Sequence, residues 1–139
     1  MDRAFLDANV LFSASLSSES RLSRLWRISD CRLLSSDYAL REAQRNLAAK
    51  HREALSALAN LSVALEMVIV PDSVGLSKAI RLDVADRPIL AAAIHGRATH
   101  LLTGDKHDFG HLMGSLVEGV AIMLPGDYLA YRSKARRSS

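Results

Sequence analysis

The stretch DRPILAAAIHGRATHLLTGD, residues 86–105, joins a predicted helix to a predicted strand and carries an aspartate at each end. Asp86 can cap the helix, Pro88 suits its first turn, and Gly96 can end it. The apolar run HLLT that follows is typical of a buried strand, and Asp105 comes just after it. The stretch therefore predicts the helix and second strand of a βαβ unit, with a carboxylate beyond the strand.

The rest of the chain repeats this alternation. Four more short apolar runs predict strands at residues 3–6, 32–35, 67–70 and 120–123. Segments of helical period predict helices at residues 22–29, 37–65 and 75–82, the longest of them a hairpin broken near Lys50 to Arg52. Alternating strands and helices favour an α/β fold with a parallel sheet covered on both faces.

Size and composition indicate one ordinary globular domain. The chain has 139 residues, of which 49% are hydrophobic, and a formal net charge of +3. We expect a domain over residues 1–130 and a mobile basic arm over residues 131–139, because YRSKARRSS lacks apolar periodicity. No apolar run approaches the roughly 18 residues that cross a membrane. Cys31 is the single cysteine, which fits a reducing cytoplasm.

Basic residues gather at residues 21–27, at residues 45–52 and in the tail. A basic surface attracts polyanions, so nucleic acid is a candidate partner. On charge alone, a solvated surface that aids solubility is the simpler interpretation.

Four acids far apart in the sequence are directed to one edge of the predicted sheet. Asp7 follows the first strand and Asp105 follows the fourth, so both lie at carboxyl ends. Asp86 begins a helix on the same edge, and Glu42 lies about one turn into the helix after residues 32–35. Ligands of open parallel sheets bind beyond the carboxyl ends of the strands. Clustered carboxylates repel one another unless a cation is present, and Mg²⁺ or Mn²⁺ prefers oxygen ligands.

Each acid also has a purely structural interpretation. Asp86 could act only as a helix cap, and Glu42 could pair with Arg41 or Arg45 on a solvated face. Asp7 and Asp105 could be turn residues after strands. All of these would have to hold together to remove the site, so we predict that the four acids share a metal ion.

These segments resemble the PIN-domain nucleases. The resemblance rests on FLDANVLFSA, on an acid within YALREAQRNL, and on DRPILAAAIHGRATHLLTGD with the acid soon after it, and it covers about residues 4–124. It implies a three-layer α/β/α fold around a short, mostly parallel sheet. It also implies a catalytic and metal-binding quartet of Asp7, Glu42, Asp86 and Asp105, with Asp108 as a further metal ligand.

The resemblance further places Asn9 and Thr103 beside the site and leaves Asp83 either sharing the role of Asp86 or merely flanking the helix. It implies Mg²⁺ or Mn²⁺ as cofactor and RNA as substrate of an endoribonuclease. Many relatives are toxins of bacterial toxin–antitoxin pairs, so an antitoxin protein and a homodimer are expected partners.

Two other functions remain open on the sequence. A PIN-like binding module would hold RNA or a protein without cutting, although such a module has no physical reason to keep repelling acids together. A phosphatase would act on a small phosphorylated substrate from the same acidic edge.

Overall fold

One six-stranded sheet forms the centre of the protein. The computed structural model describes residues 1–71 and 75–138, with side chains described up to residue 134. The strand order is β3-β2-β1-β4-β6-β5, and every neighbouring pair is parallel except β5 with β6. The strands are β1 (Asp2–Leu6), β2 (Cys31–Ser36), β3 (Glu66–Val68), β4 (His100–Leu102), β5 (Leu116–Val117) and β6 (Val120–Met123). The predicted α/β class is confirmed.

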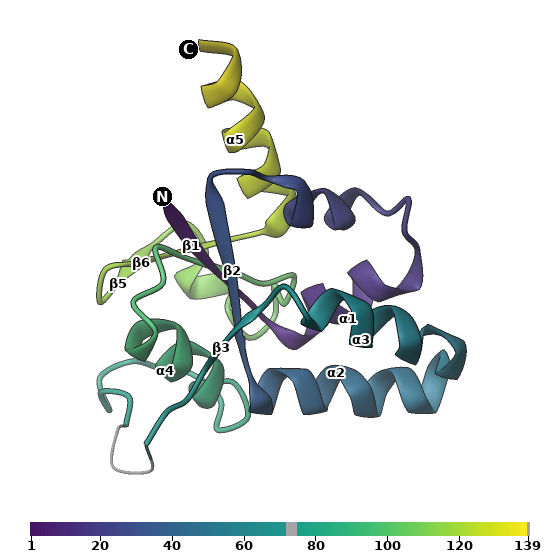
Figure 1. Cartoon of the computed structure of the whole chain (residues 1–139). Helices are drawn as coiled ribbons and strands as arrows, with labels where there is room; N and C mark the ends of the chain where they lie inside the picture. The colour runs from purple at the N-terminus through teal and green to yellow at the C-terminus, as the bar shows by residue number, and fades with distance from the viewer. Residues whose placement is uncertain (72–74, 139) are drawn as a thin grey trace.

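Helices cover both faces of this sheet. The α-helices are α1 (Ala8–Leu16), α2 (Asp37–Lys50), α3 (Leu55–Ser62), α4 (Arg87–His95) and α5 (Pro125–Ser138). The 3₁₀ helices are η1 (Arg21–Arg27), η2 (Arg52–Ala54) and η3 (Gly110–Leu112). Figure 1 shows α4 on one side of the sheet and α1, α2 and α3 on the other, which is the predicted three-layer arrangement.

The predicted helical hairpin is confirmed, and local capping explains its limits. The Ser36 side chain accepts a hydrogen bond from the Ala39 amide and so starts α2. Residue His51 leaves helical geometry, with φ −147° and ψ 64°, and ends α2. The chain then turns through η2 into α3. The break therefore lies where the sequence placed it.

The pairing of β1 with β4 positions the acidic residues. Leu6 lies opposite Leu102 in the parallel register, and the Asp7 amide donates a 3.1 Å hydrogen bond to the Leu102 carbonyl. Both strands end at this point, so Asp7 and Thr103 leave the sheet side by side. Apolar side chains from both strands, including Phe5 and Leu101, are fully buried beneath them.

The segment at residues 75–82 does not form the predicted helix. It consists of irregular backbone and a turn. The Arg87 guanidinium donates hydrogen bonds to the carbonyls of Leu76, Ser77 and Ile80. Those carbonyls are satisfied by a side chain rather than by helical amides, which lets the segment stay irregular.

Helix α5 continues to Ser138, through most of the predicted basic arm, and the mobility of that arm stays a prediction. Its Arg132 side chain donates to Asp2 Oδ2 at 2.8 Å and to the Asp30 carbonyl at 3.2 Å. These anchors are polar and lie 130 and 102 residues away in the sequence. A search for an apolar stripe could therefore not find them.

Helix α1 and strand β5 were not predicted. The sequence of α1, ANVLFSASL, is apolar almost all round, so it has no amphipathic period. Strand β5 is only two residues long. Within the described residues, none of the helices has both the length and the apolar character needed to span a membrane.

Candidate functional site

A pocket of about 220 Å³ opens at the carboxyl edge of the sheet. All four acids of the predicted quartet line it. The other lining residues are Ala8, Asn9, Phe12, Asn46 and Lys50. The structure therefore brings together side chains from the ends of β1 and β4, from α2 and from the start of α4, as the predicted topology required.

Asp7 lies at the base of this pocket and is held rigidly. Only 4% of the residue is exposed to solvent. One oxygen accepts a 2.6 Å hydrogen bond from the Ala8 amide and so caps α1. The other accepts from Thr103 Oγ1 at 2.8 Å and from Asn9 Nδ2 at 3.1 Å. Asn9 and Thr103 thus lie beside the acids, where the resemblance placed them.

The electrostatics at Asp7 disfavour a negative charge. Burial is the largest cause that raises the pKa of Asp7, and the charges of Glu42 and Asp105 raise it further. The hydrogen bonds from Thr103 and Ala8 act in the opposite direction. A carboxylate held in this way gains from any nearby cation.

Asp86 stands where α4 begins, yet its side chain makes no capping hydrogen bond. Among the described residues, its Oδ2 is the buried side-chain oxygen that lacks a hydrogen-bond partner. Burial, the neighbouring carboxyl group of Asp108 and the charges of Asp105 and Asp7 raise the pKa of Asp86 to about 7. Asp86 thus holds the N-cap position of α4 without capping it through its side chain, and its carboxylate lines the acidic pocket.

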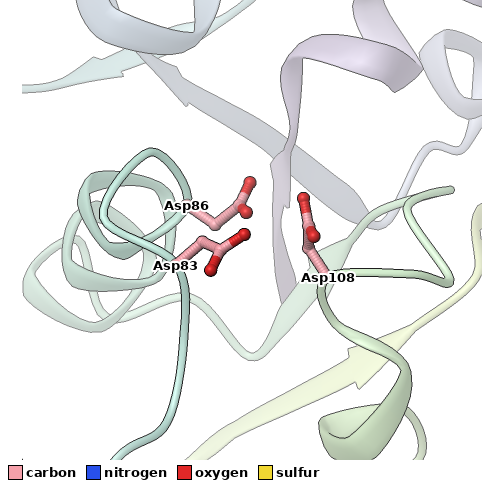
Figure 2. Close-up of side chains that lie close together, drawn as sticks. All are labelled: Asp83, Asp86 and Asp108. Atoms are coloured by element: carbon pink, nitrogen blue, oxygen red, sulfur yellow. The ribbon is translucent and has the colours of Figure 1, made fainter.

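Asp83 and Asp108 extend the acidic pocket at one side. One carboxylate oxygen each from Asp83, Asp86 and Asp108 lie within 4.8 Å of one another. Figure 2 shows Asp83 and Asp86, from the segment that enters α4, facing Asp108 across a gap. Asp108 comes from the loop after β4, where Asp105 Oδ1 accepts a 2.9 Å hydrogen bond from the Asp108 amide. Asp108, which the resemblance implied as a ligand, and Asp83, whose role the sequence left open, therefore both lie close to Asp86.

Helix α2 contributes more than the single acid that the sequence analysis identified. Glu42, Asn46 and Lys50 all line the pocket. They are spaced at i, i+4 and i+8, so they occupy one face of the helix. The spacing was visible in the sequence and could have identified Asn46 and Lys50. Arg41, one of the alternative partners of Glu42, instead forms a 2.9 Å ion pair with Asp37.

The residues present fit a hard divalent cation. The pocket offers carboxylate oxygens in excess of positive charge, and one buried oxygen has no partner. Carboxylates with raised pKa values, such as those of Asp7 and Asp86, are stabilised in the charged form by a cation. The assignment of individual residues as ligands stays a prediction.

Several solved structures share this fold. VapBC2 from Rickettsia felis, solved bound to a DNA fragment from its promoter, has a TM-score of 0.66 at 16% identity, over 86% of this chain and 96% of that one. VapBC-1 from nontypeable Haemophilus influenzae has a TM-score of 0.62 at 12% identity, over 89% of this chain and 98% of that one. Mycobacterium tuberculosis VapC20 is described as a toxin that cleaves the sarcin–ricin loop. It has a TM-score of 0.57 at 16% identity, over 75% of this chain and 91% of that one.

Comparison with curated proteins found no match. The sequence model of the PIN domain, however, matches residues 3–107, which is most of the chain and includes all four acids of the quartet. Pocket, topology and sequence match agree, and the chain belongs to the PIN-domain family.

Proposed function

We propose that this protein is a divalent-metal-dependent endoribonuclease and the toxin component of a toxin–antitoxin pair. The observation that carries the proposal is the buried Asp7, fixed by Thr103 and Asn9 in a pocket shared with three more acids. Such a set of carboxylates repels itself in the absence of a cation. It suits a divalent cation that also binds phosphate oxygens.

In this proposal Asp7, Glu42, Asp86 and Asp105 hold Mg²⁺ or Mn²⁺, and Asp108 joins them at the side of Asp86. When bound, the ion supplies Lewis acidity for in-line hydrolysis of a phosphodiester. Thr103 and Asn9 keep the Asp7 carboxylate in one orientation through their hydrogen bonds. This orientation lowers the cost of assembling the site.

Lys50 and Asn46 have a different role in the proposal, because neither is an acid and both face the same pocket. A lysine ammonium attracts the phosphate of the strand to be cut, and an amide can donate to a phosphate or ribose oxygen. Their position on the α2 face opposite the β1–β4 edge would hold the strand across the acids.

The assignment as a toxin, with an antitoxin partner, is supported by the solved structures of similar fold. Two are described as VapBC assemblies and the third as a toxin that cleaves the sarcin–ricin loop. We propose RNA as the substrate on the same ground and on the family membership. A homodimer, expected from the resemblance, belongs to this proposal as well.

The test is cleavage of labelled RNA by purified protein, first in EDTA and then with Mn²⁺ or Mg²⁺. We expect cutting only with the metal, and a loss of at least about 100-fold in Asp7→Asn, since the buried ligand is removed. Glu42→Gln should also lose activity. Glu53→Gln is the matched control, because Glu53 lies on η2, is 78% exposed in its side chain and is not among the residues lining the pocket.

Three kinds of result would contradict the proposal. Cutting that persists in EDTA or in Asp7→Asn would place the chemistry outside this pocket. RNA binding without cutting under any divalent metal would favour the binding module, whereas hydrolysis of a generic phosphomonoester but not of RNA would favour the phosphatase.

A further inference from the structure

A second and larger cavity lies between η1 and α5. Its volume is about 1100 Å³. One wall is the 3₁₀ helix with Arg21, Arg24 and Arg27, and the other is the face of α5 that carries Tyr131 and Arg132. In Figure 1, α5 projects beyond the rest of the protein, with the start of the chain near its base. We refer to this cavity as the basic groove.

The 3₁₀ geometry of η1 aligns its arginines. A 3₁₀ helix has three residues per turn, so side chains at i and i+3 lie directly above one another. Arg21, Arg24 and Arg27 therefore form one row, with successive Cα atoms about 6 Å apart along the axis. In an α-helix the same three residues would spread around the surface. Leu25, on another side of η1, is buried in the core and fixes the row relative to the groove.

This row of charge has no carboxylate partner among the described residues. All three arginines are exposed, and across residues 1–71 and 75–134 none of them forms an ion pair with a carboxylate. Asp2, at the base of the groove, already accepts hydrogen bonds from Arg132 and Tyr128. Asp30 is the other acid of the groove. Three aligned cations repel one another, and a polyanion that spans them removes the repulsion.

An aromatic ring faces the same groove. Tyr131 is 55% exposed, although it is a large hydrophobic residue. Its ring lies 6.5 Å from the rings of both Tyr128 and His100. Tyr128 is fully buried and supports Tyr131 from below. An exposed, supported aromatic ring beside a row of cations is the arrangement that binds single-stranded nucleic acid by stacking on a base.

The basic groove leads toward the acidic pocket. A smaller cavity of about 300 Å³ shares Asn9 and Asp105 with the acidic pocket and is also lined by Leu22 of η1 and Pro125 of α5. Arg21 lies at this end of the groove, since a Cβ placed on Gly126 would be 3.9 Å from its Nη1. A strand leaving the acids can therefore reach Arg21 first and then Arg24 and Arg27.

We propose that the basic groove binds the single-stranded RNA that flanks the cleavage position, with phosphates on Arg21, Arg24 and Arg27 and a base on Tyr131. The inference rests on the proposed function for its direction toward the acids. RNA fits better than an acidic protein segment, because every nucleotide offers both a phosphate for the cations and a flat base for the aromatic ring. A second copy of the chain fits poorly, since a two-fold contact would bring the two arginine rows together.

The test separates binding from cutting. Binding of a labelled single-stranded RNA of about 12 nucleotides is measured by fluorescence anisotropy in EDTA over a range of salt, with Asp7→Asn as the parent protein. We compare Arg24→Gln/Arg27→Gln, Tyr131→Ala and Tyr131→Phe with the parent. Arg97→Gln is the matched control, because Arg97 is exposed and lies after α4, outside the groove. Thermal melting of each variant checks that it is folded.

Removing two phosphate contacts should weaken binding and reduce the slope of log K against log salt by about 1.4. Tyr131→Ala should bind about five-fold or more weakly at unchanged salt slope, and Tyr131→Phe should restore the affinity. Parent-like affinity and slope in the arginine variant would overturn the proposal. So would displacement of the RNA by polyglutamate of equal charge with equal potency, which would indicate an acidic protein segment instead.

A second readout keeps this proposal distinct from the proposed function. In the otherwise unchanged sequence, Arg24→Gln/Arg27→Gln should lose efficiency on long RNA and retain it on an RNA only a few nucleotides long, which reaches no farther than the acidic pocket. If the unchanged protein cuts no RNA, the proposed function fails, while the binding measurement still decides the groove. Equal loss on short and long RNA would overturn the groove as a site for flanking RNA.

Discussion

Thr103 Oγ1 donates a 2.8 Å hydrogen bond to Asp7 Oδ2 and thereby ties the carboxyl end of β4 to that of β1. The same hydroxyl oxygen accepts hydrogen bonds from the Asp105 amide at 3.1 Å and from Asn9 Nδ2 at 3.3 Å. One buried hydroxyl therefore fixes one acid directly and positions the backbone of another. The geometry of the pocket depends on this residue although it is not an acid.

Thr103→Val keeps the shape of the side chain and removes the hydroxyl. We expect the protein to lose about 1–3 kcal/mol of unfolding free energy, because a charged acceptor loses its donor in a buried place. The affinity for Mn²⁺ should fall about 10-fold or more, since the ligand is no longer oriented. Isothermal titration and urea unfolding measure the two effects. Thr103→Ser keeps a hydroxyl and should recover most of the stability and most of the Mn²⁺ affinity. Equal losses in Thr103→Ser and Thr103→Val would contradict the role of the hydrogen bond.

Asp86→Asn should have opposite effects with and without metal. In EDTA at pH 8 the substitution removes the charge of a partly buried carboxyl group whose pKa is raised to about 7, so the melting temperature should rise by a few degrees. With millimolar Mn²⁺ the native sequence should gain stability and the variant should gain less, because a ligand has been lost. Differential scanning fluorimetry gives both values. A variant that is less stable than the native sequence in EDTA would show that Asp86 stabilises the fold.

The contribution of Asp86 to the stability of the metal-free protein should fall as the pH rises from about 4 to about 7. The pKa of Asp86 is raised from 3.8 to about 7, so the folded state binds more protons than the unfolded state in this interval, and unfolding free energy decreases with pH. The raised pKa of Asp7 acts in the same direction. The pKa of Asp108 is lowered, so the stability that this group contributes is lost only when the pH falls below the usual pKa of an aspartate, outside this interval.

Melting temperatures in EDTA across this pH range check the trend, with Asp86→Asn as the comparison, whose slope should be shallower. Metal affinity should show the reverse dependence and increase through pH 7, since the cation replaces a proton. Parallel slopes in the two proteins would assign the effect to other groups.

Tyr128→Phe should weaken the attachment of α5. The Tyr128 hydroxyl donates to Asp2 Oδ2 at 2.7 Å and contacts Cys31 Sγ at 3.3 Å, and the ring is fully buried. Its removal leaves Asp2 with Arg132, so we expect a loss of about 1–2 kcal/mol of unfolding free energy. Urea unfolding followed by Trp26 fluorescence measures it, since Trp26 is the only tryptophan and donates from its indole to the Leu61 carbonyl. Tyr131→Phe, at an exposed ring of the same helix, is the control and should change stability little.

The parallel sheet, the helical hairpin and the four acids were predictable because each has a local signature. The run HLLT is apolar and short; Asp105 follows it after Gly104, and Asp7 directly follows the run AFL. Once strands and helices alternate, topology alone directs carboxyl ends to one edge. The position of Asp7 and Asp105 in one pocket required no further information.

Other features could not be predicted from local patterns. The course of residues 75–82 depends on hydrogen bonds from Arg87, and the attachment of α5 depends on Asp2 and Asp30, at the other end of the chain. The sequence could name Asp86 only as a cap or a ligand, and the absence of a capping hydrogen bond favours the pocket.

The order of short apolar runs and the acids placed after them determined the fold class and the edge on which the acidic residues meet. Tertiary structure alone decided which carboxylate is buried and which oxygen lacks a partner, and that a row of arginines faces a tyrosine across a groove. The physical reason is that periodicity and capping act within a few residues, whereas burial, charge and hydrogen bonding depend on neighbours that only the folded chain brings together.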